Sequence, residues 1–485
     1  MDRQDELAVN IPNVKRRTFL RRACETAIAC ALPPAFAFAQ QTASEQEIGS
    51  TTFSRTQLSG LLDTLLETGS PELRSFAIDV YATCVLGKIR KPDPPLKQAW
   101  IVPGGGYDGQ WLWDTMFVAD LLSLLPGQEE LIRGVFQNYW DFQRRWNAAK
   151  PEFMHGMVAN FIKPYDAPER DNGTVWQTFP AYSQAPLLAW GMERVYLRNQ
   201  DRQLLSAGLK PLESFHEWYW RERDLKGIGL VGVGAYSGVT QHARFETYDL
   251  EVDLDGLKMI SHPARPAGAE NGNWYGNIAI PANTAYLLLS ELSLERMARQ
   301  LGEEEMAGRR RARYEKGAAA MRRYMWDETA SCFLALDIES MKKVQAPTVG
   351  GFMPLMARVP SQGQAKAMAA ALGTPAWDTP LPIPTVARTN AQFISGKFWR
   401  GDVWPAPDFQ VASGLALYGL RDAAARIADR LIAHAMKVGI SEHYDSVTGV
   451  PLGVSGLGMS STALTVALDG LTSSAYAVQL RRRGA

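Results

Sequence analysis

Residues 398–405, which read FWRGDVWP, combine side-chain types that are suited to binding sugars. The indole rings of Trp399 and Trp404 offer flat apolar faces on which a sugar ring can stack. Arg400 lies between them and presents several N–H donors in a fixed plane to hydroxyl oxygens. The sequence therefore predicts that Trp399, Arg400 and Trp404 contact a carbohydrate.

Residues 441–449, SEHYDSVTG, follow after one predicted helix and bring a carboxylate next to an aromatic side chain just before a turn. An ionised carboxylate can remove a proton from water, so Glu442 is a candidate general base. Tyr444 lies two residues further on and is expected to border the same substrate. The glycine-rich loop that follows, residues 453–458, favours an enclosed Glu442 over an ordinary surface glutamate.

These two segments resemble the C-terminal half of the inverting α-glycosidases with an (α/α)6 barrel. Those enzymes form glycoside hydrolase families 63 and 37, which include processing glucosidases, mannosylglycerate hydrolases and trehalases. Their pattern reads Tyr-Trp-Arg-Gly-Pro-Val-Trp-Pro, then Glu-x-Tyr-Asp-x-x-Thr-Gly, and the glutamate of the second motif is their base. The resemblance implies an all-α toroid of six helical hairpins and assigns the base to Glu442.

Residues 103–117, PGGGYDGQWLWDTMF, resemble the trehalase signature Pro-Gly-Gly-Arg-Phe-x-x-x-Tyr-x-Trp-Asp-Ser. The resemblance places Trp113 and Asp114 in the −1 subsite, where an indole face lies beside a hydrogen-bond acceptor. The arginine of the signature is Gly106 here, so one sugar contact is missing or moved, which weakens a trehalase assignment. Asp114 could also cap the start of a helix, and that role is compatible with substrate binding.

Gln184 lies in a further matching segment, residues 177–188, which resembles the families' Ser-Gln-Pro-Pro-Leu-Leu. Its side-chain amide, at the start of a predicted helix, could bind sugar hydroxyls. Three more segments match family loops or helix ends, at 325–328, 350–355 and 381–386. These matches in the expected order argue against chance, and together they cover nearly the whole mature chain.

An inverting hydrolase also needs a protonated carboxyl group that donates a proton to the leaving oxygen, ~6.5–9.5 Å from the base. The families carry it in Glu-Ser-Gly-x-Asp-x-x-x-Arg, and the best register here, residues 236–245, puts Thr240 at the acid position. A threonine hydroxyl cannot act as a general acid near neutral pH. Three carboxyls are candidates instead. Asp249 ranks first and Glu246 second, from a shifted register, and Asp402 ranks third because two flanking tryptophans favour its protonated form.

Helices must position these segments. From about residue 56, apolar residues recur with helical spacing, which predicts about ten to twelve helices. Long loops rich in glycine, proline, asparagine and aromatic residues separate them, at 98–112, 150–182, 226–283, 338–362, 373–409 and 439–459. Helices that alternate with long loops fit a barrel of helical hairpins with its site at one end. We expect one domain over residues 56–478, after a flexible leader at 40–55.

Residues 1–39 are typical of a twin-arginine export signal. The arginine pair at 16–17 precedes an alanine-rich apolar run that is too short to span a bilayer permanently. A small-x-small pattern ends at Ala39, so we expect the mature chain to begin at Gln40, in the periplasm and free of the membrane. A basic surface helix is one alternative for this segment. Lipid anchoring at Cys30 is a minor alternative, because the preceding residues lack the leucine of a lipobox.

The composition narrows the range of partners. The 485-residue chain carries 51 basic and 51 acidic residues, which gives no electrostatic case for nucleic acid or an anionic surface. No His/Cys cluster has metal-ligand spacing and no glycine-rich loop has phosphate-binding context, so neither a metal nor a cofactor is predicted. Only Cys84 and Cys332 follow the expected cleavage site, and two distant cysteines do not define a disulfide.

These features predict a periplasmic, metal-independent, inverting exo-glycosidase acting on a small α-linked glucoside or mannoside. A trehalase is an alternative within the class. A catalytically silent sugar-binding relative is another, because Thr240 occupies the acid position. An epimerase or lyase on the same barrel is a third, although epimerases depend on paired histidines and the six here show no pairing. The sequence leaves the sugar, the aglycone and the oligomeric state open.

Overall fold

A computed structural model describes residues 46–48, 51–68, 70–94, 96–149, 155–162, 183–234, 259–261 and 274–481. The chain divides into two compact units, Met1–Ser44 and Glu45–Ala485, and the fold described below is that of the second unit. The predicted export signal lies outside the described residues, as do Thr240, Glu246 and Asp249.

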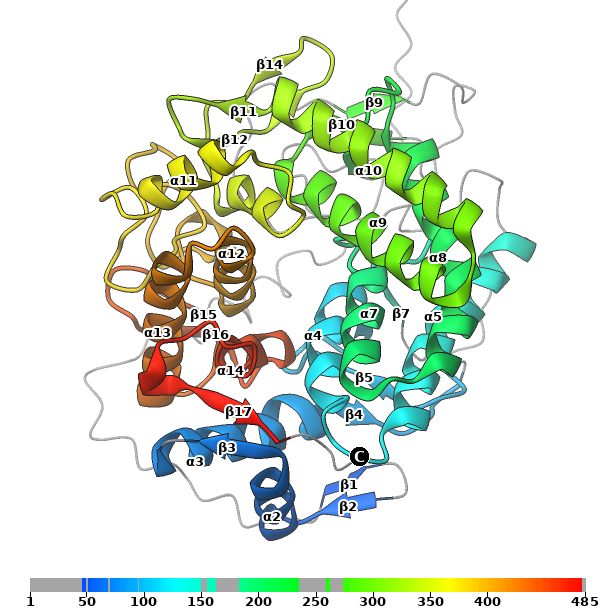
Figure 1. The fold of residues 1–485 in the computed structure, drawn as a ribbon, viewed down its shortest axis with the longest axis vertical. Coiled ribbons are helices and arrows are strands. Elements are labelled where there is room, and N and C mark those ends of the chain that lie inside the picture. Colours follow the sequence, from blue (N-terminus) through cyan, green and yellow to red (C-terminus); the bar gives the residue numbers. More distant parts are fainter. Residues whose placement is uncertain are drawn as a thin grey trace, which may run out of the picture. The chain divides into compact units, whose positions relative to one another are not determined.

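Two layers of helices build the second unit (Figure 1). In the inner layer each element contacts the next: α4 (Leu112–Leu122), α7 (Leu188–Asn199), α9 (Pro281–Leu301), η5 (Val349–Leu355), α12 (Pro405–Leu417) and α14 (Thr462–Leu468). The short helix η7 (Gly458–Ser461) closes this ring by packing between α14 and α4. The outer helices alternate with the inner ones along the chain: α3 (Pro71–Val80), α5 (Glu129–Ala149), α8 (Arg202–Arg223), α10 (Glu304–Tyr324), α11 (Gln362–Ala371) and α13 (Arg421–Val438). The fold is the predicted (α/α)6 barrel.

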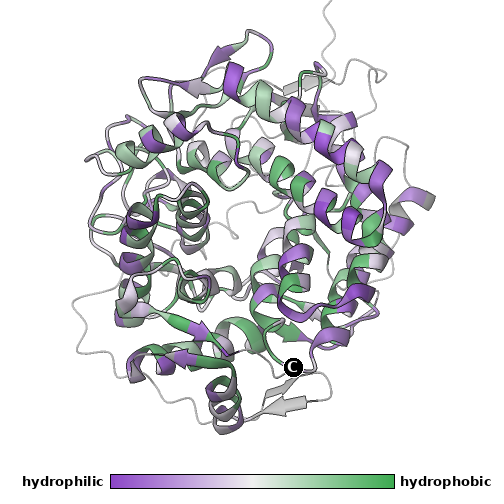
Figure 2. Ribbon diagram, viewed as in Figure 1, coloured by the Kyte–Doolittle hydropathy of each residue, from purple (hydrophilic) through white to green (hydrophobic). Residues whose placement is uncertain are grey.

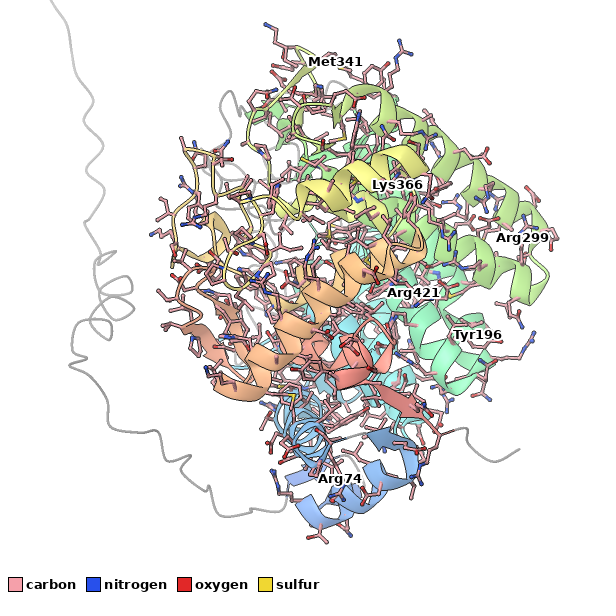
Figure 3. The ribbon with its side chains drawn as sticks, turned by 60° about the vertical axis from the view of Figure 1, so that its left-hand side comes forward. Arg74, Tyr196, Arg299, Met341, Lys366 and Arg421 are labelled. Atoms are coloured by element: carbon pink, nitrogen blue, oxygen red, sulfur yellow. The ribbon has the colours of Figure 1, made fainter. Side chains whose placement is uncertain are left out.

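Burial explains which helices lie inside. Every residue of α4 and α14 is buried, and α9 and α12 are buried along most of their length. In α8 and α13, buried residues alternate with exposed ones, as expected of helices that cover a core with one apolar face. Figure 2 shows hydrophobic residues concentrated on the inner helices. Figure 3 shows basic side chains on the outside, such as Arg299 in the last turn of α9, Lys366 of α11 and Arg421 at the start of α13.

Local sequence sets where several helices begin and end. Ser54 and Ser361 form capping boxes at the starts of α2 (Arg55–Leu65) and α11. Proline occupies the first turn of α3, α9 and α12, where its missing N–H is not needed. Gly302 ends α9 in the left-handed conformation, with a φ of 82°.

Short antiparallel strands occupy several of the predicted loops. The strand β10 (Trp274–Ala279) pairs with β8 (Gly232–Gly234), β9 (Met259–Ser261) and β13 (Leu336–Asp337), and β13 pairs with β14 (Lys342–Lys343). Nearer the C-terminus, β15 (Ser441–Tyr444) pairs with β16 (Pro451–Ser455), and their register shifts between Ser441 and His443. Glu442 therefore lies at an irregularity of the hairpin, where a side chain can be redirected.

Within the described ranges, no helix combines the length and the apolar character that a membrane span requires. Cys84 and Cys332 are both buried and free. Burial raises the pKa of the Cys84 thiol to about 11 and that of Cys332 to about 12. Both thiols are therefore protonated and unreactive at neutral pH.

Candidate active site

Glu442 is held in one orientation on β15. Its Oε1 accepts a hydrogen bond from the Tyr107 hydroxyl at 2.8 Å, and its Oε2 accepts one from the Val454 backbone N–H at 2.9 Å. Gly453 makes room for the side chain, since a Cβ there would lie 2.5 Å from Oε2. Two donors from different loops thus fix the carboxylate, and a fixed carboxylate is what a general base requires.

Tyr107 is the last residue of the glycine-rich segment 103–107, which places its hydroxyl next to Glu442. Gly105 has a left-handed φ of 58°, and a Cβ at this position would lie 2.5 Å from Val454 Cγ2. Gly105 thus contacts the loop that follows the base, and its missing side chain allows the two loops to pack closely.

Asp114 is buried in the first turn of α4. Burial, and then the nearby negative charge of Glu442, raise the pKa of this carboxyl to about 7. Hydrogen bonds with Gln184 and Trp113 partly oppose the rise. Gln184 also accepts a hydrogen bond from the Trp113 backbone N–H at 3.1 Å. The structure thus brings Trp113, Asp114 and Gln184 together, within electrostatic reach of Glu442.

A stack of three rings lies beside this group. The indoles of Trp399 and Trp404 stack with centroids 3.8 Å apart and planes at 6°. Trp404 also stacks on the His443 ring, at 4.9 Å and 17°. Because two rings stack on Trp404 and only 2% of it is exposed, the structure argues against the predicted stacking of a sugar on it. Trp113 and Trp399, whose rings lie 6.4 Å apart, are also largely buried, with 7% and 4% exposed, and they are the remaining indole pair for the sugar wall.

Tyr444 and Arg400 differ in what they can contact. Tyr444 is fully buried, and its hydroxyl donates to the Gly439 carbonyl at 2.9 Å while accepting from the Ser441 N–H at 3.1 Å. It therefore stabilises the start of the hairpin, which corrects the prediction that it borders the substrate. Arg400 donates from Nε to the Gln392 carbonyl at 3.1 Å and is only partly buried, so it stays a candidate for sugar contact.

Of the three predicted acids, only Asp402 lies in the part of the chain that the structure describes. It is completely buried, and its Oδ2 lies 2.8 Å from His443 Nδ1. A carboxyl enclosed in this way offers no face to a leaving oxygen, so the structure argues against Asp402 as the acid. Asp249 and Glu246 stay as the candidates, and both lie outside the described residues.

Two residues of the site, Tyr107 and His443, are not among those predicted from the sequence. Tyr107 belongs to the PGGGY motif, and its phenol is a group that can donate a hydrogen bond to a carboxylate. His443 lies directly after Glu442 in the sequence, and this adjacency is the signal that points to it. Among the described residues, no group of three or more His, Cys, Asp or Glu side chains could hold a metal ion.

Comparisons with known proteins agree with this fold. Residues 107–462 match the family model described as the mannosylglycerate hydrolase MGH1-like glycoside hydrolase domain. Mannosylglycerate hydrolase of Rubrobacter radiotolerans is 31% identical over 413 residues, which cover 75% of this chain and 89% of the relative. Mannosylglycerate hydrolase of Thermus thermophilus is 24% identical over 417 residues, covering 75% of this chain and 95% of the relative.

Solved structures share the barrel. A GH63 mannosylglycerate hydrolase of Thermus thermophilus, in complex with Tris and D-glycerate, superposes with a TM-score of 0.61 at 22% identity, covering 81% of this chain and 99% of that one. Neutral trehalase Nth1 of Saccharomyces cerevisiae superposes with a TM-score of 0.50 at 14% identity, covering 80% of this chain and 77% of that one. Both likenesses support the (α/α)6 fold.

Proposed function

This chain belongs to the mannosylglycerate hydrolase MGH1-like glycoside hydrolase family, and from that premise we propose that it removes a terminal α-linked mannose or glucose from a small acceptor, with inversion. Glycoside hydrolysis follows from family membership. The sugar, the acceptor, the exo-action and the stereochemistry are our inference.

The fixed position of Glu442 is the main support for this function. Its two hydrogen bonds, from Tyr107 and Val454, hold the carboxylate ready to remove a proton from an attacking water. Water attacks the sugar from the face opposite the leaving group, while a second carboxyl protonates the leaving oxygen. We assign that acid to Asp249 first and to Glu246 second.

Sugar binding is proposed for the residues near Glu442. Trp113 and Trp399 offer the apolar wall, and Gln184 and Arg400 offer hydrogen bonds to hydroxyls. Because the pKa of Asp114 is about 7, its carboxyl can either donate or accept a hydrogen bond near neutral pH. This mixed character suits a sugar hydroxyl, which itself both donates and accepts.

The relatives suggest which acceptor to test first. Those from Rubrobacter and Thermus are named as mannosylglycerate hydrolases, and a Thermus enzyme has been crystallised with D-glycerate and with glucose. We therefore propose a glycosylglycerate as the first substrate class. Trehalose is the second, because the barrel also superposes on a trehalase.

The test is a substrate panel. Purified protein lacking residues 1–39 is incubated with α-mannosylglycerate, α-glucosylglycerate, trehalose and other α-linked disaccharides, and released sugar is measured. The proposal expects release from at least one small α-glycoside. If the protein binds one of these glycosides tightly but releases no sugar, the catalytically silent sugar-binding relative is favoured. Thr240 at the acid position is the sequence feature that supports this alternative.

We further propose export to the periplasm through the twin-arginine route. The arginine pair at 16–17, the apolar run and the small-x-small pattern ending at Ala39 support this proposal.

A further inference from the structure

Asp402 and His443 form a buried pair directly behind the candidate active site. Asp402 Oδ2 lies 2.8 Å from His443 Nδ1, and both side chains are almost completely shielded from water. Within the described part of the chain, neither carboxylate oxygen of Asp402 accepts a hydrogen bond, so the close approach of His443 Nδ1 is the polar contact that the structure gives this carboxyl. A buried carboxylate is costly unless it is paired, so each of these residues depends on the other.

His443 is the last ring of the stack that begins at the proposed sugar wall. Its ring stacks on Trp404, and Trp404 stacks on Trp399. The Phe398 and His443 rings form a T-shaped contact, with centroids 5.2 Å apart and planes at 87°. The contact with Asp402 fixes the remaining freedom of the imidazole, its rotation in its own plane. The Asp402–His443 pair therefore supports Trp404, and Trp404 in turn supports the orientation of Trp399.

The same pair is connected to the base through the backbone. Val403 and Tyr444 exchange two hydrogen bonds, with N–O distances of 2.8 and 2.9 Å, which tie the Asp402 segment to β15. His443 follows Glu442 directly in the chain, so a shift of the His443 backbone also shifts the backbone of Glu442. Their side chains point to opposite faces of the strand. The register shift at this point of the hairpin leaves Glu442 with less support from β16 than a regular ladder would give.

We infer that Asp402 is a positioning residue, which holds the His443 imidazole through the close contact of its Oδ2 with Nδ1 and so sets both the plane of the Trp399–Trp404–His443 stack and the direction of Glu442. The inference rests on the proposed function, since it gives Glu442 the role of base. The families that the sequence resembles have proline where this chain has Asp402, so the pair is a departure from their pattern.

The test compares Asp402→Ala, His443→Ala and the double variant with the rescue variant Asp402→Asn, which keeps the size of the side chain and an oxygen that can face His443 Nδ1. Each alanine variant is expected to lower kcat by about 10- to 100-fold, because a displacement of about 1 Å at a catalytic group costs that much. The double variant should lose no more than the worse single one, because the two residues act as a unit. Asp402→Asn should recover kcat to within about threefold.

The matched control is the buried pair of His216 on α8 and Glu291 on α9, whose Nδ1 and Oε1 lie 3.2 Å apart. His216→Asn should lower the melting temperature by as much as Asp402→Ala does, yet leave kcat within about twofold. A purely structural role for Asp402 would instead give equal loss of melting temperature and an unchanged kcat. Multiplicative losses in the double variant would also overturn the inference.

A crystal structure of Asp402→Ala separates this inference from the proposed function. The inference expects the His443 ring to turn away from Trp404 and the Tyr107–Glu442 hydrogen bond to lengthen. An unchanged stack and an unchanged hydrogen bond would contradict it, whatever the enzyme hydrolyses. Absence of hydrolysis by the wild-type protein would refute the proposed function, and the crystal structure would still decide the positioning role. If the alanine variant does not fold, His443→Asn replaces it, and the expected results are then a tilted Trp404 ring and a longer Tyr107–Glu442 hydrogen bond.

Discussion

The Tyr107 hydroxyl donates a hydrogen bond to Glu442 Oε1 at 2.8 Å and so joins two segments that lie 335 residues apart in the sequence. This bond lies near the point where the ring of inner helices closes, since α4 follows Tyr107 and the short helix η7, which packs against α4, follows Glu442. It is also one of only two hydrogen bonds to the side chain of Glu442 that are found among the described residues.

Tyr107→Phe removes this donor without changing the shape of the side chain. A hydrogen bond to a charged group contributes about 1.5–3 kcal/mol, so kcat/KM should fall by about 10- to 100-fold if the bond positions the base. Tyr418→Phe is the control, because the Tyr418 hydroxyl donates to the Pro360 carbonyl at 2.7 Å, away from Glu442. Steady-state kinetics of both variants check this, and equal effects in the two would contradict the role of Tyr107.

Gly453→Ala should displace Glu442. A Cβ at Gly453 would lie 2.5 Å from Glu442 Oε2, and the residue has a left-handed φ of 71°. We expect a loss of about 100-fold or more in kcat with the barrel still folded. Gly419→Ala is the matched control, since its φ is 76° but nothing lies within 4 Å of the added Cβ. It should show the same backbone strain with normal turnover, and a comparable loss of turnover in both variants would assign the effect to strain.

How far the sequence predicts this site depends on the kind of contact. Glu442, Asp114 and Gln184 could be picked out because each lies in a motif with its own spacing. Trp404 and Tyr444 were placed at the substrate wrongly, because burial is decided by partners far along the chain. Trp404 is covered by His443, and Tyr444 turns its hydroxyl back to Gly439. The helical periodicity predicted the helices, and the resemblance to the two glycosidase families implied the (α/α)6 barrel. The pairing of β15 with β16 depends instead on a turn and a register, which the spacing of apolar residues does not determine.

Asp114 should make stability depend on pH. Its pKa is raised from 3.8 to about 7 in the folded protein, so between these values the folded state binds more protons than the unfolded state. Stability from this group is therefore complete below about pH 4 and is lost as the pH rises toward 7. Asp114→Asn, which cannot ionise, should lose less stability than the wild type over this interval. Melting temperatures from pH 4 to 8 test this, and parallel curves would contradict the assignment.

Export should depend on the arginine pair. Twin-arginine translocation recognises those two side chains, so changing Arg16 and Arg17 to lysine should leave the uncleaved precursor in the cytoplasm. Fractionation with a periplasmic marker enzyme measures this. Cleaved double variant in the periplasm would show that another route exports the chain.

The most direct test follows α-mannosylglycerate hydrolysis by proton NMR for the wild type and for Glu442→Gln. We predict that the wild type releases β-mannose first, because inversion converts an α-linkage into a β-product. We also predict that Glu442→Gln, nearly isosteric but unable to accept the water proton, turns over at least about 100-fold more slowly. Release of α-mannose first, or near-normal turnover by Glu442→Gln, would contradict the central claim that Glu442 is the base of an inverting hydrolase.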